Sequence, residues 1–220
     1  MFTPDSWRGS RGQKPGAAQC SFSRSLSDEE VRQFLSAQGK LPFSYGEVGA
    51  SREDATADLP PGYAVDRYRM KLGEGIEAYA RAVEALRRWR QFELGWVRHL
   101  PPRAPIEVGM PVGILAWHPG FWSLNLARVA YLVEETGDVE RFGYGTLPSH
   151  AERDEERFGV EWNRQDGSFY YDVFAFSRPN HPLAWIFGLD RLPFACLLQR
   201  RFVRDSKRAM VEAVASKTKR

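Results

Sequence analysis

The spacing of apolar residues changes once along this chain of 220 residues, and that change limits the folds open to it. Over residues 74–92 apolar side chains recur at every third or fourth position, which predicts one amphipathic helix. After this helix the spacing falls to two, so we expect strands near residues 92–99, 106–117, 121–134, 139–147, 157–163 and 168–177. A further strand precedes the helix at residues 63–73. Successive strands without helices between them favour an antiparallel sheet.

A long amphipathic segment follows the strands. Residues 181–214 have a helical pattern, with a predicted break at residues 188–193. Beyond the break a stripe at four-residue spacing, interrupted only by Ser206, contains Phe194, Leu198, Phe202, Met210 and Val214. We therefore predict an α+β fold of helix-grip type, in which a curled antiparallel sheet of six to seven strands packs its concave face on the long C-terminal helix. A calycin-like β-barrel with the helix outside is the alternative.

The N-terminal forty residues differ in composition from the rest. Residues 1–20 are rich in Gly, Ser, Pro and Arg, which is typical of a flexible segment. A short helix follows, because Ser27 can cap it, Glu30 completes a capping box and Gly39 can end it. We expect residues 1–40 to form a flexible extension with a short helix, and residues 41–220 to form a single α+β domain.

The distribution of charge bears on possible partners, and the cysteines bear on the cellular compartment. The net charge is +3, but eight basic residues stand against two acidic ones from Gln199 onward. This is typical of the solvated face of a terminal helix, and weak contact with a membrane surface is a further possibility; no motif predicts nucleic-acid binding. The two cysteines, Cys20 and Cys196, have no metal-type spacing and fit a reducing compartment. Without a secretory signal or an apolar run of membrane-spanning length, the protein is expected to be soluble and cytoplasmic.

Several motifs in the right order resemble a known family. They are "FSYGEVGA", "PPGYAVDRYRMKLG", "LRRWRQFELGW", "YGTLPSHAERDEERFGVEW", "YDVFAFSRP" and "LLQRRFVRDSKRAM". Together they resemble the uncharacterised protein family 0548, also called domain of unknown function 1990, from about residue 41 to residue 210. Ser149 and Asp154 replace two glycines that are usual in that family. The resemblance implies a fold related to lipid- and polyketide-binding (START-like) helix-grip proteins, and it implies no activity.

One charged segment stands between two predicted strands. It contains His150, Glu152, Asp154, Glu155 and Glu156. The favoured interpretation is a solvated loop whose acids are neutralised by neighbouring arginines, Arg153 and Arg157. General acid–base catalysis by His150 with Glu152 is a weaker hypothesis, since it requires both groups to face a cavity. A metal site lacks a second histidine or cysteine nearby, so we expect no metal and no cofactor.

The middle of the chain is strongly aromatic and carries a few polar residues on elements that look buried. Aromatic walls with sparse polar groups are typical of a small-molecule pocket, although the same residues can also fill a core. The predicted ligand-binding residues are Trp117, Trp122, Arg128, Tyr144, Thr146, Tyr171, Phe174 and Gln199.

The leading hypothesis is a protein that binds an apolar or amphipathic small molecule between the sheet and the C-terminal helix. One alternative is a hydrolase- or cyclase-like enzyme using the same cavity. The other is a module that contacts a membrane or a protein through the basic C-terminal helix. No phosphate-binding loop, zinc-protease motif or nucleophile elbow occurs in the sequence.

Overall fold

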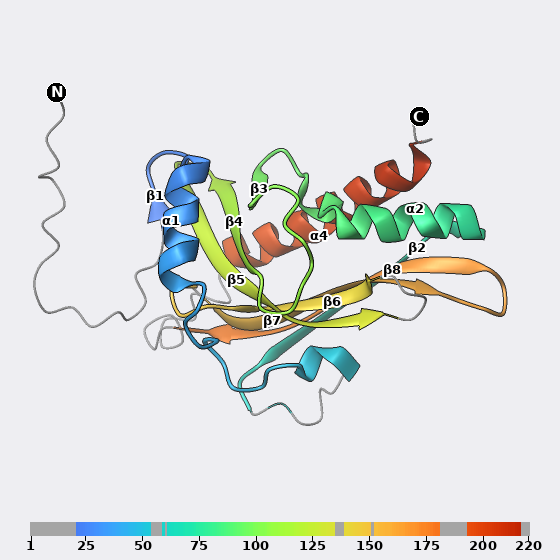
Figure 1. Ribbon diagram of the computed structural model, residues 1–220, viewed down its shortest axis with the longest axis horizontal. Helices are drawn as coiled ribbons and strands as arrows, with labels where there is room; N and C mark the ends of the chain where they lie inside the picture. Colours follow the sequence, from blue (N-terminus) through green and yellow to red (C-terminus); the bar gives the residue numbers. More distant parts are fainter. Residues whose placement is uncertain are drawn as a thin grey trace, which may run out of the picture.

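The computed structural model describes residues 21–53, 59, 61–134, 139–150, 152–180 and 193–216, and in them one antiparallel sheet dominates (Figure 1). Its strands are β1 (Ser21–Phe22), β2 (Ala64–Glu74), β3 (Val97–Leu100), β4 (Pro111–His118), β5 (Phe121–Glu134), β6 (Val139–Thr146), β7 (Glu152–Trp162) and β8 (Ser168–Pro179). The strand order is β2-β8-β7-β6-β5-β4-β3, with β1 added beside β5. In the described residues β2 and β3 are the two edges of an open sheet, so the β-barrel alternative is wrong and the predicted curled sheet is confirmed.

One predicted strand ends up mostly outside the sheet. The segment 92–99 was expected to be extended, but it starts in a 3₁₀ turn, η3 (Arg90–Phe92), and only its end belongs to β3. The backbone explains the difference, because Trp89 and Gly95 have φ angles of 58° and 75°. Left-handed residues on both sides of η3 interrupt an extended chain.

Helices α2 (Ile76–Arg87) and α4 (Pro193–Ala215) lie with η3 on the concave face of the sheet (Figure 1). The core between these two layers is aromatic, and the stripe of α4 enters it through Phe202, Met210 and Val214. The predicted packing of the C-terminal helix on the sheet is therefore confirmed, while the predicted helix over residues 181–192 lies outside the described residues. Among the helices described, none combines the length and the apolar composition needed to cross a bilayer.

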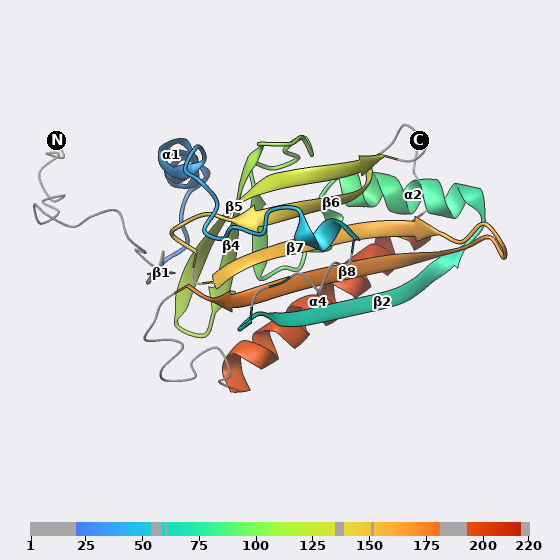
Figure 2. The ribbon, with the colours of Figure 1, turned by 90° about the horizontal axis from the view of Figure 1, so that it is seen from below.

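The convex face is covered as well (Figure 2). Helix α1 (Asp28–Gln38) has the predicted capping box between Ser27 and Glu30, and it packs on β3, β4 and β5 through Val31 and Leu35. Next to it the chain from Phe43 to η1 (Ala50–Glu53) lies across β7 and β8. Residues 1–20 lie outside the described part, and the expected division at residue 40 stays a prediction.

Two glycines of β6 allow tyrosine rings to lie directly against the convex face of the strand. A Cβ atom at Gly145 would overlap the ring of Tyr45, and one at Gly143 would overlap the ring of Tyr131. The convex face therefore requires glycine at both positions, since no side chain fits between the strand and these tyrosines.

Candidate functional site

The charged segment is mostly strand rather than loop, because β7 begins at Glu152. Alternation sends Glu155 and Arg157 to the convex face, and Asp154 and Glu156 to the concave face together with Phe158. The predicted solvated loop is wrong. The first half of this strand has charged residues on both faces. It therefore lacks the alternation of apolar and polar residues by which a strand is recognised in a sequence.

On the convex face Glu155 is fully buried and anchors the covering segment. Its carboxylate accepts hydrogen bonds from the Tyr45 hydroxyl (2.6 Å), the Gly49 amide (2.7 Å), and both the amide and the hydroxyl of Ser51 (2.9 and 2.7 Å). Beside it Arg157 pairs with Asp172 at 2.6 Å, both buried. The role predicted for the arginines, neutralising the loop acids, is therefore wrong for Arg157, and this network is a structural anchor.

The concave face carries a second polar set, which we call the acid–tyrosine cluster: Tyr144, Asp154, Glu156, Tyr171 and Ser206. The Tyr144 hydroxyl donates to Glu156 Oε2 at 2.6 Å from the facing strand. Burial, with the charges of nearby carboxylates, raises the pKa of Glu156 to about 8. Burial likewise raises the pKa of Asp154 to about 7, with the charge of Glu155 adding to it. At neutral pH the cluster therefore holds protons that exposed carboxyl groups would have lost.

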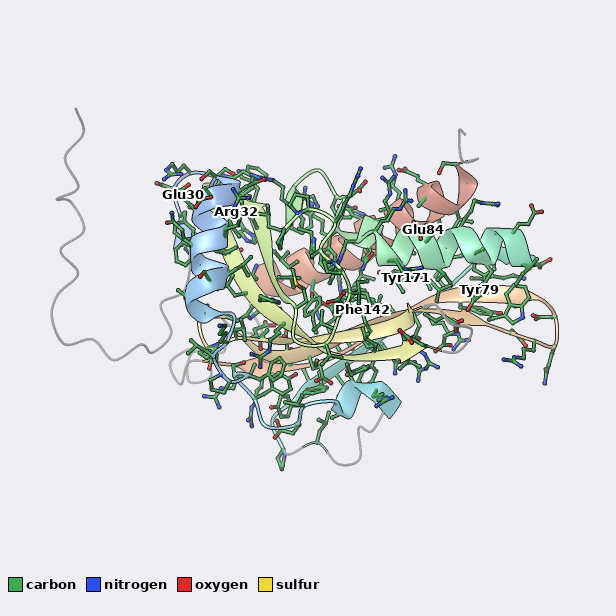
Figure 3. All side chains as sticks on the ribbon, viewed as in Figure 1. Glu30, Arg32, Tyr79, Glu84, Phe142 and Tyr171 are labelled. Carbon is green, nitrogen blue, oxygen red and sulfur yellow. The ribbon has the colours of Figure 1, made fainter. Side chains whose placement is uncertain are left out.

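The helix closes the cluster from the other side. Ser206 of α4 lies 2.8 Å from the Tyr171 hydroxyl, so the single polar residue in the apolar stripe pairs with the sheet. Figure 3 shows Tyr171 and Phe142 in the layer between the strands and the two helices. Phe92 lies in the same layer, with its ring centroid 6.2 Å from that of Tyr144 and 5.5 Å from that of Phe202.

Several buried polar atoms in this layer lack a hydrogen-bond partner within the described chain. They are Asp154 Oδ1, both amide atoms of Gln91, and both ring nitrogens of His99. His99 shares the concave side of β3 with Val97 and stacks on Trp89 at 4.0 Å. Burial lowers the pKa of His99 to about 3; the main chain at Pro101 opposes this, but the contact falls short of hydrogen-bond geometry.

Sequence reasoning missed both of these residues. For His99 a signal was present, since "VRHL" alternates and places the imidazole on the same side as Val97. For Gln91 no signal existed, because a residue in a single 3₁₀ turn between two elements has no periodic pattern to follow.

The predicted ligand-binding residues divide between the faces. Tyr144 and Tyr171 belong to the concave core, and Thr146 follows Tyr144 by alternation and bonds to the main chain of Asp154. Gln199 on α4 is exposed and donates to Asp66 Oδ2 at 2.6 Å. The structure brings Tyr144, Tyr171 and Gln199 to the side of the helix, whereas the Thr146 hydroxyl lies 2.7 Å from Ser44 Oγ in the segment that covers the convex face.

The other four lie on the convex side, away from the predicted site. Phe174 packs beside Tyr45, and Arg128 donates to the carbonyls of Gly39 and Leu41. Trp122 packs against the core beneath α1, and Trp117, 40% exposed, is its cross-strand partner. Their predicted place between sheet and C-terminal helix is wrong, because both faces of this sheet are covered and aromatic residues occur on both.

The weak catalytic candidates are engaged locally. His150 Nδ1 accepts a hydrogen bond from the Glu152 amide at 3.0 Å, which closes the turn before β7. Burial lowers the pKa of His150, against the charge of Glu152. Within the described residues, no group of three His, Cys, Asp or Glu side chains has an arrangement able to hold a metal ion.

Four of the basic side chains of α4 make contacts within the molecule. Arg204 pairs with Asp205 and Arg208 with Glu212, while Arg201 lies over the ring of Trp96 at 4.4 Å. Lys207 lies over the ring of Tyr68 at 5.4 Å. These contacts compete with a partner for the positive charge of the helix.

Comparison of the fold with solved structures finds partial similarity. A crystal structure of Ara h 8.0201 aligns with a TM-score of 0.49 and 11% identity, over 71% of this chain and 100% of that chain.

Comparison of the sequence finds closer relatives. A UPF0548 protein of Dictyostelium discoideum is 35% identical over 209 residues, which cover 88% of this chain and 95% of that protein. A UPF0548 protein of Deinococcus radiodurans is 35% identical over 195 residues, covering 84% of this chain and 93% of the relative. The family model described as "Domain of unknown function (DUF1990)" matches residues 44–209, from the covering segment of the convex face into α4. The chain therefore belongs to the DUF1990 family, whose relatives here carry the name UPF0548 protein.

Proposed function

We propose that this protein binds a small molecule with an apolar body and a few polar groups, between the concave face of the sheet and α4. The observation that carries the proposal is the set of unpartnered polar atoms at Gln91, His99 and Asp154. A buried polar group without a partner costs about 1–3 kcal/mol, so a fold that retains several of them in one aromatic layer is favoured when something else supplies the partners.

The aromatic residues of the same layer support the same proposal. Four rings pack against one another with centroid separations of 5.4–6.4 Å: those of Phe92, Tyr144, Phe158 and Phe202. Flat side chains with a few convergent polar groups are the usual lining of small-molecule sites. On the convex face the buried Glu155 carboxylate has four hydrogen bonds from the chain itself, and Asp172 Oδ2, which has no hydrogen bond within the described residues, lies 3.6 Å from Arg67 Nε.

The test combines native mass spectrometry with a fluorescence titration. The native mass of freshly purified protein is compared with its denatured mass, and the protein is then titrated with N-phenyl-1-naphthylamine, an aromatic fluorophore that is neutral at pH 7. We expect either an added mass that is lost on denaturation or saturable uptake of the fluorophore. A clean native mass together with no uptake would reject the proposal.

Two matched variants locate the binding. Tyr171→Phe removes a hydroxyl that contacts Ser206 on the concave side, and Tyr131→Phe removes one that contacts Ser51 on the convex side at 2.7 Å. We expect Tyr171→Phe to change the affinity for the fluorophore by roughly threefold or more, since one hydrogen-bonding group is worth about 1 kcal/mol. Tyr131→Phe is expected to leave it unchanged. The reverse pattern would place binding on the wrong face.

A further inference from the structure

The acid–tyrosine cluster is rich in carboxyl groups and poor in cations. Glu156 and Asp154 stand on the concave side of β7, and the charges of Asp66 and Glu152 also act on Glu156. In the described chain neither Glu156 nor Asp154 forms an ion pair with Lys or Arg. The nearby arginines of β7 point elsewhere, Arg157 to Asp172 and Arg153 to Asn180.

The side chains that contact the cluster from the neighbouring elements are neutral. From β6 and β8 come the neutral hydroxyls of Tyr144 and Tyr171, and from α4 comes Ser206. The Gln199 amide of α4 bonds to Asp66, and the Lys207 ammonium group of α4 lies over the ring of Tyr68. The potential at the cluster is therefore negative as soon as either carboxyl group ionises.

The two carboxyl groups are desolvated but still accessible. Burial is the largest cause of the raised pKa of Glu156 and of Asp154. Both side chains are nevertheless only half-buried, although Asp154 Oδ1 itself is buried and has no partner. Desolvated acids that a ligand group can reach bind a cation strongly, because the charge pair forms in a medium of low dielectric constant.

From this arrangement we propose that the ligand carries a protonated amine, held by Glu156 and Asp154, with an apolar body against Phe92, Tyr144 and Tyr171. This inference rests on the proposed function and names the class of its ligand. The aromatic rings favour the same class, since a cation near a ring face gains electrostatic energy. An anionic ligand would oppose ionisation of these carboxyl groups, and a neutral ligand would leave them protonated and gain only hydrogen bonds from them.

Binding of an ammonium group has a measurable consequence for protons. In the free protein Glu156 is mostly protonated at pH 7, since its pKa is about 8. The cation stabilises the carboxylate, so the carboxyl proton leaves for the solvent as the complex forms. We expect a release on the order of one proton per bound amine.

The experiment is calorimetric titration of the full chain with three probes of similar size: phenethylamine, 2-phenylethanol and 3-phenylpropionate. Each titration is run at pH 7 in phosphate and in Tris, whose ionisation enthalpies differ, so that proton release is counted. We expect phenethylamine to bind at least tenfold more tightly than the alcohol and to release a proton. The carboxylate is expected to bind most weakly.

Three variants test the assignment to residues. Glu156→Gln and Asp154→Asn keep the size of the side chain, and each is expected to weaken amine binding about tenfold. Glu156→Gln also removes the larger part of the proton release, because Asp154 with its pKa of about 7 is only half protonated at pH 7. Glu161→Gln, on the same strand but pairing with Arg69 and Arg141, is the matched control and is expected to change neither quantity.

The outcomes separate this inference from the proposed function. If the alcohol binds as tightly as the amine without proton release, the cationic ligand is excluded while small-molecule binding stands. The same holds if the fluorophore binds and phenethylamine does not. If neither the fluorophore nor any of the three probes binds, the proposed function fails and this inference fails with it.

Discussion

Glu155 and Glu156 are neighbours in sequence, but β7 directs their carboxyl groups to opposite faces of the sheet. Glu155 accepts hydrogen bonds from four donors and anchors the segment that runs from Phe43 to η1. Glu156 meets one hydroxyl and a set of other acids. The identity of a residue therefore says little about its role here, because the role depends on which donors the opposite layer presents.

The anchor role predicts a large loss of stability for Glu155→Gln. The amide would present its NH₂ group to some of the four donors, which leaves buried donors unsatisfied. We expect the free energy of unfolding to fall by about 3 kcal/mol, as for breaking a buried charged network. Urea denaturation measures this. Glu29→Gln, at a glutamate whose side chain is 65% exposed, is the control and should change it by less than about 0.5 kcal/mol. Equal effects would show that Glu155 is no anchor.

At the scale of elements, the periodic parts of the fold were predictable and the aperiodic parts were not. Helices α1 and α2 follow from the capping box and the apolar period, and β2, β5, β6 and β8 from alternation. The start of β7 was missed because charges occupy both of its faces. The location of η3 was missed because left-handed residues at its borders leave no repeating pattern.

The candidate site was predictable only in part, and for a related reason. Tyr144 and Tyr171 were found from their place in aromatic strands. Phe174 and Trp122 were assigned to the same site, because an aromatic strand does not reveal which of its faces meets the C-terminal helix. That assignment depends on the cover of the convex face by α1 and by the segment around Tyr45, which involves contacts distant in sequence.

Helix α1 provides the test at this scale. Val31 is fully buried against Leu124 and Leu126 of the sheet, so α1 is expected to unfold together with it. Truncation by Val31→Ala should lower the global free energy of unfolding by about 2 kcal/mol. Gln33→Ala, on the exposed side of the same helix, is the control. If Val31→Ala changes only the amide exchange of residues 28–38 and leaves global unfolding unaltered, α1 is a separate unit and the division at residue 40 gains support.

At the scale of the whole molecule, the two faces of the sheet differ in how their buried charged groups are paired. The convex face has its buried charges paired, by Glu155 with its donors and by Arg157 with Asp172. The concave face retains acids that burial keeps protonated. This asymmetry would link the proposed ligand binding to global stability, since the protonation state of the concave carboxyl groups would change both.

The pH dependence of unfolding follows from the same asymmetry. Glu156 has a pKa of about 8 in the folded protein against an ordinary value of 4.5, and Asp154 has a pKa of about 7 against 3.8. Between these pKa values the folded state binds more protons than the unfolded state. The contribution of the two carboxyl groups to stability is therefore complete below about pH 4 and is lost as the pH rises through 8.

In Glu156→Gln one of the two groups no longer titrates. We expect the variant to match the wild type at pH 5 and to exceed its Tm by about 3 °C or more at pH 8.5, since about 1 kcal/mol shifts Tm by 2–4 °C at this size. Thermal unfolding followed by circular dichroism at several pH values measures the difference.

The control is Ser206→Ala, which perturbs the same cluster without removing a titratable group. Its plot of Tm against pH should therefore run parallel to that of the wild type, at lower Tm. A Glu156→Gln curve that also runs parallel would show that this carboxyl group titrates normally, and it would remove the electrostatic basis for a cationic ligand.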